Sequence, residues 1–174
     1  MIKILCLSGS LRTNSSTHVV LNEIIHHPHP DVTFTVYDHL GTLPHFDDNA
    51  ETPLEVTRFR EALKNADGVL FVTPEYAFGV PGTLKNALDW TVSSGEFVGK
   101  PTAVVVAATG GENAYHSLML TLKAISANIS EKSTLLVSFI RSKINDTSVK
   151  DPELNELLRS VTEDLIKNIT RSSV

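Results

Sequence analysis

Residues 8–17 carry the side chains that best suit the binding of a phosphate group. The candidate donors are four of its hydroxyl residues and one guanidinium group: Ser10, Arg12, Ser15, Ser16 and Thr17. A helix that begins here adds unpaired N–H groups and a partial positive charge at its first turn. These donors suit a phosphate monoester, although an ordinary capped loop remains the alternative. The segment lacks GxxxxGK followed by Ser or Thr, so it is not a Walker A loop. GxGxxG is also absent, which disfavours direct dinucleotide binding.

Residues 73–90 form a second segment whose composition suits a flat ligand. Pro74 and Pro81 restrict the backbone on either side of a short loop, and Tyr76 and Phe78 offer aromatic surface between them. A rigid loop presents its backbone N–H groups to the edge of a planar ring at a low entropic cost. The alternative is a stiff structural turn before a helix. For Trp90 we prefer a structural role, in the core or at a subunit contact.

The spacing of Cys6 and Arg12 allows a different chemistry. It is C-x5-R, the spacing with which a thiolate and an arginine share a phosphate loop in low-molecular-weight tyrosine phosphatases. Asp151 before Pro152 would then be the late general acid. However, Cys6 lies inside a strand pattern and no Tyr follows Pro152. We therefore expect Cys6 to be a buried core thiol.

The elements that must position these segments alternate along the chain. The predicted strands are 2–7, 32–37, 68–73, 102–108 and 134–139, and the predicted helices are 16–25, 53–65, 81–92, 112–128 and one capped by Asp151 that runs to Ile169. Continuous Val, Leu and Ile runs indicate strands buried on both faces, as in a parallel sheet. Right-handed crossovers then give a doubly wound α/β three-layer sandwich. Ligands of such folds bind beyond the carboxyl ends of the strands, where loops 8–16, 73–80 and 108–112 are expected.

Composition limits the class of protein. The chain has 174 residues, of which 41% are hydrophobic and 20% charged, so we expect one globular domain spanning residues 1–174. A net charge of −5 disfavours a nucleic-acid partner. The single cysteine and the short apolar run at residues 4–7 favour a cytoplasmic protein without a membrane segment. The three histidines between 26 and 29 lack the spacing of a zinc site, so no metal site is predicted.

The second segment closely resembles a family signature. T-P-E-Y-N-x-S-x-P-G-x-L-K-N-A-I-D-W is typical of the NADPH-dependent FMN reductase family, and residues 73–90 follow it. The first loop matches the family's G-S-L-R-x-x-S-x-N motif at residues 9–12 and Ser15. The resemblance implies a flavodoxin-like fold with a five-stranded parallel sheet in the order 2-1-3-4-5. It also implies non-covalently bound FMN, with NADPH or NADH as co-substrate.

The resemblance assigns residues to parts of FMN. The residues implied to hold the phosphate are Ser10, Arg12, Ser15, Ser16 and Thr17. The isoalloxazine is implied to lie along Pro74, Glu75, Tyr76, Ala77 and Phe78. Its pyrimidine side is implied to approach Thr109 and Gly110. The chain departs from the family at Thr17 and Ala77, where the signatures have Asn, and at Gly79, where they have Ser. Its third loop, 108–111, is shorter than in many relatives. These departures bear on substrate preference and on the ring contacts more than on flavin binding.

The resemblance also implies a reaction. A hydride passes from the nicotinamide to the flavin, and a small acceptor such as a flavin, quinone, azo compound or metal oxyanion then takes the same place. This exchange needs an open face of the ring and no acid–base side chain, so no catalytic residue is assigned. The family forms homodimers or homotetramers. Two other classes remain open: a flavodoxin-type electron carrier, and a flavin-binding sensor or assembly factor without turnover.

Overall fold

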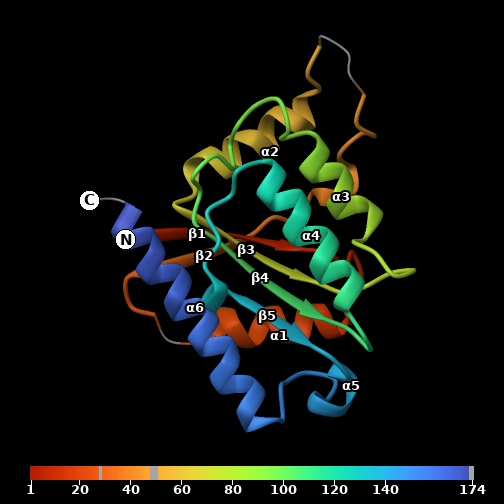
Figure 1. The fold of residues 1–174 in the computed structure, drawn as a ribbon, viewed down its shortest axis with the longest axis vertical. Helices are drawn as coiled ribbons and strands as arrows, with labels where there is room; N and C mark the ends of the chain where they lie inside the picture. Colours follow the sequence, from red (N-terminus) through yellow and green to blue (C-terminus); the bar gives the residue numbers. More distant parts are fainter. Residues whose placement is uncertain (28, 48–50, 173–174) are drawn as a thin grey trace.

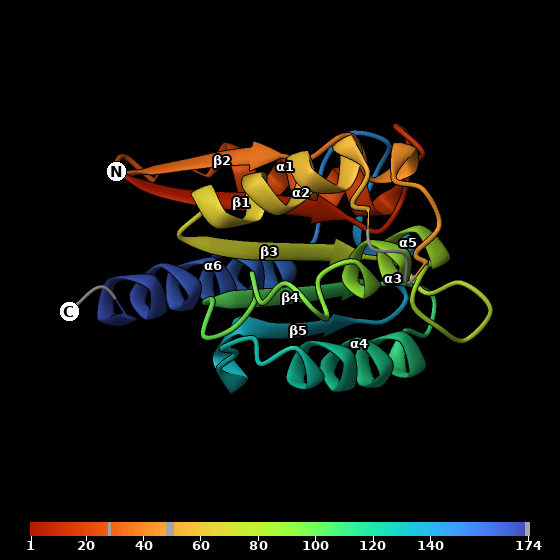
Figure 2. The same ribbon diagram turned by 90° about the horizontal axis from the view of Figure 1, so that it is seen from above.

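The strands of this chain form one parallel sheet. The computed structural model describes residues 1–27, 29–47 and 51–172. Its strands are β1 (Ile2–Ser8), β2 (Val32–Val36), β3 (Gly68–Thr73), β4 (Thr102–Ala107) and β5 (Thr134–Val137). They lie in the order β2-β1-β3-β4-β5, and all point toward the same edge (Figure 2). The predicted α/β class, parallel sheet and strand order are therefore confirmed.

Helices cover both faces of the sheet (Figures 1 and 2). One face carries α1 (Ser16–His26) and α6 (Pro152–Ser172), and the other carries α2 (Leu54–Asn65), α3 (Gly82–Asp89) and α4 (Glu112–Ala124). The shorter elements are α5 (Ile140–Lys143) and the 3₁₀ turns η1 (Leu40–Thr42) and η2 (Glu131–Ser133). Within the described residues, no helix is both long enough and apolar enough to cross a lipid bilayer.

The sheet brings the three predicted loops to one edge. Every residue of β3 and β4 is buried, because both strands lie in the middle of the sheet with helices on each face. The register places Ser8 opposite Val72 and Thr73 opposite Val106. The carboxyl ends of β1, β3 and β4 are therefore level, and the loops that leave them are neighbours.

Several predicted boundaries were wrong. The fifth strand ends at Val137 rather than residue 139, because Phe139 adopts a left-handed φ of 55° and starts the unpredicted helix α5. The helix predicted over 112–128 ends at Ala124, and Ser126 beyond it has a φ of 61°. The helix predicted over 81–92 is only Gly82–Asp89. Leu157, assigned to the buried stripe of the last helix, is 43% exposed.

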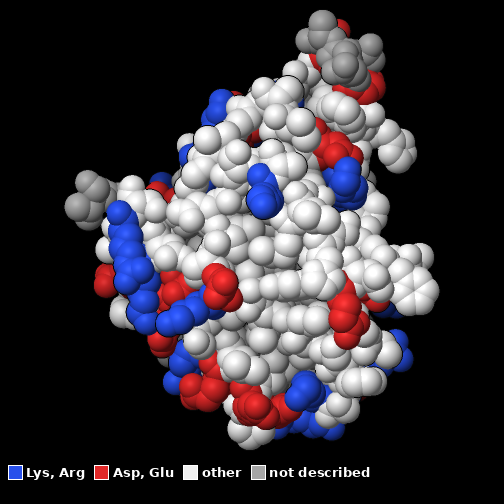
Figure 3. Space-filling model, viewed as in Figure 1, with Lys and Arg blue, Asp and Glu red and all other residues white. Residues whose placement is uncertain are grey.

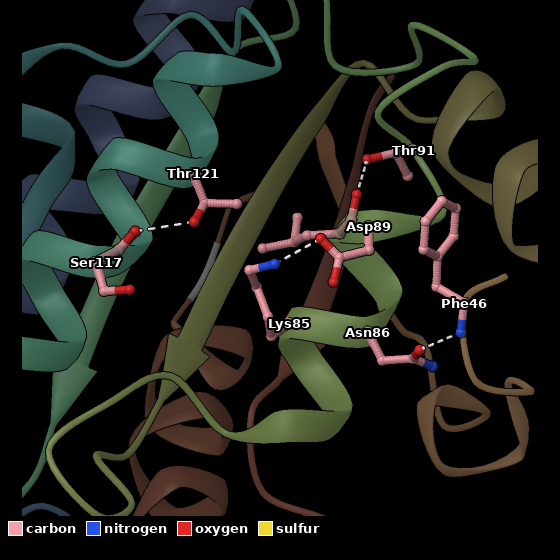
Figure 4. Close-up of polar contacts among 8 residues, drawn as sticks. Phe46, Lys85, Asn86, Asp89, Thr91, Ser117 and Thr121 are labelled. Atoms are coloured by element: carbon pink, nitrogen blue, oxygen red, sulfur yellow. Dashed lines mark hydrogen bonds and ion pairs between the residues drawn. The ribbon is translucent and has the colours of Figure 1, made fainter. Parts of the chain in front are cut away.

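The helix after the second loop is anchored to the segment before α2 (Figure 4). The Asn86 side chain accepts a hydrogen bond from the Phe46 N–H at 2.8 Å and donates one to the Pro44 carbonyl at 2.9 Å. The Trp90 indole N–H donates to the same carbonyl at 2.9 Å, and the ring is buried. Trp90 therefore has the structural role that the sequence analysis preferred.

Candidate functional site

The first loop is held close to β3 by a glycine. A Cβ atom at Gly9 would lie 2.0 Å from the Thr73 Oγ1, so no larger residue fits this crossing without movement. The Gly9 N–H donates to the Val72 carbonyl at 2.9 Å. Ser8 Oγ donates to the Ser10 carbonyl at 2.9 Å, and Ser10 Oγ accepts from the Arg12 N–H at 3.3 Å. The loop is therefore shaped by its own hydrogen bonds.

The first turn of α1 has the features expected of an anion site. Ser15 is its N-cap, and its Oγ accepts a hydrogen bond from the His18 N–H at 3.2 Å. Arg12, Ser15 and Ser16 line a cavity of about 640 Å³. Ser10 and Thr17, which are buried, are not among the described residues that line it. The structure thus brings together three of the five predicted phosphate residues at one open surface.

The second loop ends in a strained turn. The N–H of Tyr76 donates to the Gly79 carbonyl and the N–H of Gly79 donates to the Tyr76 carbonyl, both at 3.0 Å. Ala77 and Phe78 between them have positive φ angles of 49° and 58°. Two central residues with positive φ define a type I′ turn, which favours Asn and Gly. The backbone of the Ala-Phe pair is therefore strained. The Phe78 side chain at this turn is 81% exposed.

The tyrosine before this turn connects the second loop to the first. Its hydroxyl lies 3.4 Å from Ser10 Oγ, within the limit of a weak hydrogen bond. The ring is about half exposed, so it forms part of the surface between the loops. The Tyr76 hydroxyl therefore contacts the first loop, while its ring is partly exposed between the loops.

Glu75 connects the second loop to the third. Its carboxylate accepts hydrogen bonds from the Gly111 N–H at 3.3 Å and from the Ala114 N–H at 2.9 Å. Gly111 is the N-cap of α4 and has a φ of 114°, without a side-chain cap of its own. A carboxylate from another loop therefore satisfies the first turn of α4, where negative charge is favoured. This side-chain role was not apparent from the family signature.

Loop 108–111 also contacts the segment after β5. The Thr109 carbonyl accepts a hydrogen bond from the Phe139 N–H at 3.0 Å, and the Gly110 carbonyl accepts one from Ser138 Oγ at 3.1 Å. Arg141, two residues beyond Phe139, lines the same cavity as Arg12. Sequence reasoning missed Arg141, because nothing in its spacing relates it to the first loop. Asn145-Asp146-Thr147 is typical of a turn, which was the one signal in this region.

Cys6 does not have the environment of a phosphatase nucleophile. It lies in the middle of β1 and is fully buried, and burial raises the pKa of its thiol to about 12. The residue proposed as the late acid has the opposite character. A hydrogen bond from Lys143 lowers the pKa of Asp151, which also caps α6 through the N–H groups of Glu153 and Leu154. The thiol is protonated and inaccessible, so the phosphatase interpretation was wrong.

Comparison with known proteins identifies the family. Residues 2–141 match the family model described as NADPH-dependent FMN reductase. The chain belongs to this family. The match spans loops one to three and ends at Arg141 of α5. Membership makes the chain an NAD(P)H-dependent flavin oxidoreductase with FMN as its cofactor, as the resemblance of its two motifs predicted.

Individual relatives agree with the family assignment. The chain is 35% identical over 145 residues to an NAD(P)H-dependent FMN reductase of Pseudomonas aeruginosa, covering 79% of this chain and 78% of the relative. It is 31% identical over 174 residues to an NADPH azoreductase of a Bacillus species, covering 97% and 90%. Among solved structures, the flavoenzyme NAD(P)H:(acceptor) oxidoreductase FerB of Paracoccus denitrificans superposes with a TM-score of 0.84, 27% identity and 98% of each chain.

Within the described residues, no group of three or more His, Cys, Asp or Glu side chains is arranged to hold a metal ion.

Proposed function

We propose that residues 1–174 act as one FMN-binding unit that passes a hydride from NADPH or NADH to a small planar acceptor. Bound FMN supplies the redox chemistry, because its ring accepts a hydride and releases it again. The observation that carries the proposal is the joining of three loops at one edge of the sheet. Tyr76 contacts Ser10 of the first loop, and Glu75 binds the third.

The first loop is the proposed phosphate site. The first-turn amides of α1 and the Arg12 guanidinium are its donors, with hydroxyl groups from Ser15 and Ser16. The Arg12 guanidinium has no hydrogen-bond or ion-pair partner among the residues described, so it is available to a ligand. Ser10 and Thr17, whose side chains are buried, would contribute mainly by shaping the backbone. These residues fit the phosphate end of FMN.

The second and third loops form the proposed ring site. The type I′ turn fixes the backbone N–H groups of Ala77 and Phe78, and the Glu75 carboxylate fixes the spacing to the third loop through Gly111 and Ala114. Preset amides of this kind stabilise negative charge without reorganisation. Phe78, exposed at the tip of the turn, would border the ring and limit the entry of water. No side chain has to move a proton.

The acceptors that we propose are planar and electron-poor. Relatives are named azoreductase and quinone reductase, and the Tyr76 and Phe78 rings offer an exposed surface against which a flat molecule can stack. We therefore place quinones and azo compounds first, ahead of free flavins and metal oxyanions.

We also propose that the chain forms a homodimer or homotetramer. The face that carries α2, α3 and α4 has few charged side chains at its centre, and most lie around the margin (Figure 3). Val92 and Leu120 are large apolar residues that are more than half exposed. Such a surface is typical of an interface between subunits. Light scattering coupled to gel filtration measures the mass, and a monomer at micromolar concentration would contradict this part of the proposal.

The visible spectrum of the purified protein tests the function. We expect flavin absorption that bleaches anaerobically with NADPH or NADH and returns when a benzoquinone is added. Protein that neither gains thermal stability nor quenches flavin fluorescence at saturating FMN would end the proposal. Protein that binds FMN but is bleached by neither nicotinamide nucleotide would support the electron carrier instead.

A further inference from the structure

A second arginine lines the cavity that contains the proposed phosphate site. Arg141 of α5 and Arg12 of the first loop line one cavity of about 640 Å³ (Figure 1 shows α5 beyond the carboxyl end of β5). In the part of the chain that the structure describes, Arg141 has no hydrogen-bond or ion-pair partner, as found for Arg12. Two unpaired cations thus meet at one cavity of a chain whose net charge is −5. Their combined field favours an anionic ligand.

The position of Arg141 is set by its helix. The amides of Phe139 and Ile140 donate to the carbonyls of Thr109 and Ala108, at 3.0 and 3.1 Å. The Ile140 side chain is buried in the core beneath α5. Phe139 accepts an unfavourable φ of 55° at this point. The helix that carries Arg141 is therefore fixed to the third loop.

The far wall of the cavity is a small hairpin over residues 144–149. Its ends pair through an antiparallel bridge between Ile144 and Val149. The Asn145 side-chain oxygen accepts hydrogen bonds from the N–H groups of Thr147 at 2.9 Å and Ser148 at 2.8 Å. An ion pair between Lys143 and Asp151, at 2.6 Å, closes the base. These contacts lie within the hairpin or at its base and restrict its conformations, which reduces the entropic cost of binding.

The cavity is much larger than one phosphate group requires. Sites for whole small molecules have volumes of roughly 300–1,000 Å³, and this cavity lies within that range. The Asp146 carboxylate lines it together with the arginines, so it offers acceptor oxygens for the hydroxyl and amino hydrogens of a nucleoside. The cavity therefore combines cations for phosphate with acceptors for a sugar or a base.

We propose that this cavity binds the adenosine phosphate portion of a dinucleotide, with Arg141 contacting a phosphate that does not belong to FMN. The inference rests on the proposed function, in which Arg12 and the α1 amides hold the FMN phosphate. Two ligands carry an adenosine phosphate to this place: NADPH, through its 2′-phosphate, and FAD, through its adenylate. The recognition chemistry is the same for both, and the choice between them is experimental.

Calorimetric titration of the FMN-loaded protein with 2′,5′-ADP and with 5′-AMP tests the proposal. We expect Arg141→Gln to raise the Kd of 2′,5′-ADP by at least about tenfold, because a charge-assisted contact is lost. The Kd of FMN should not change. Arg171→Gln, which removes an exposed arginine at the far end of α6, is the matched control and should leave both constants unchanged. Thermal melting verifies that both variants are folded.

The outcomes separate the two sources. A large loss for 2′,5′-ADP with little for 5′-AMP identifies NADPH, and KM should then rise for NADPH and not for NADH. Equal losses for both probes, with weaker FAD and unchanged FMN, identify FAD. The proposal is overturned if neither probe binds the wild-type protein, if Arg141→Gln binds both probes as the wild type does, or if that variant loses FMN in parallel. Failure to take up FMN at all contradicts the proposed function instead.

Discussion

The Glu75 carboxylate lies 2.9 Å from the Ala114 amide, so the loop after β3 caps the helix that follows β4. The same carboxylate accepts from the Gly111 N–H. The loop proposed to hold the flavin ring and the loop proposed to meet its pyrimidine side are therefore held at a fixed spacing by one side chain. The residue that caps α4 therefore also belongs to the proposed ring site.

Replacing Glu75 should weaken both the cap of α4 and the proposed ring site. We expect Glu75→Ala to lower the free energy of unfolding by about 1 kcal/mol, the usual value of an N-cap, and to weaken FMN binding as well. Glu75→Gln keeps an acceptor oxygen and should lose less stability and less FMN affinity. Urea denaturation and flavin fluorescence titration measure the two effects. Glu55→Ala, in the first turn of α2, is a control that should leave FMN affinity unchanged. Wild-type stability in the Glu75→Ala protein would show that the cap is unimportant.

A substitution in the strained turn should raise the stability rather than lower it. Ala77→Asn should raise the free energy of unfolding by about 0.5–1 kcal/mol, because Asn accepts a left-handed conformation more easily than Ala. Ser126→Asn, at a left-handed position outside the three loops, should stabilise similarly. Only the change at residue 77 should alter the kinetics with quinones. Destabilisation by Ala77→Asn in urea would mean that the turn is not under strain.

The buried thiol predicts a dependence on alkaline pH. Burial raises the pKa of Cys6 from 9.0 to about 12, so the folded state retains a proton that the unfolded state loses between these values. The resulting stability is complete below pH 9 and should fall by about 1.4 kcal/mol for each pH unit up to 12. The difference in unfolding free energy between wild type and Cys6→Ala isolates this slope.

The same variant tests the chemistry. We expect the thiol to resist iodoacetamide at neutral pH, and Cys6→Ala to retain its reaction with NADPH. A pH-independent difference between the two proteins, or rapid alkylation of the native thiol, would contradict the environment described for Cys6.

Removal of the Arg12 side chain should measure the strength of the proposed phosphate contact. Arg12→Ala should weaken FMN by about 1.5–3 kcal/mol, the value of a hydrogen bond to a charged group. Because the guanidinium contacts the phosphate in the proposal, riboflavin, which lacks one, should bind both proteins equally. Fluorescence titration with each flavin gives the comparison. An unchanged FMN affinity would remove Arg12 from the site.

Much of this fold follows from local rules that the sequence displays. Asp151 before Pro152 predicted the start of α6, and the structure has Asp151 as its cap. Buried runs such as β3 and β4 were predicted because central parallel strands lack polar residues. The convergence of the three loops followed from the parallel sheet itself, since all of its strands end at one edge.

Other features depend on contacts that no local pattern displays. The helix α5 has only four residues, too few to show a helical period, and its N-cap is a Phe in a conformation that Phe disfavours. Leu157 has the spacing of the buried stripe, but no element in the described part of the chain covers it fully, and it is 43% exposed. The family signature predicts Glu75 beside the ring, but it does not show that the carboxylate caps another helix. Its partner, Ala114, lies 39 residues further along the chain.

The hairpin over residues 144–149 draws most of its internal order from Asn145, whose oxygen binds only residues two and three positions ahead. The exposed tip at residues 145–147 should therefore be exchangeable between homologous reductases, provided that Ile144 and Val149, which belong to or pack against the core, are kept. Because residues 145–147 line the cavity proposed to bind the dinucleotide, such grafts offer a way to vary dinucleotide preference without altering Arg12 or the first turn of α1.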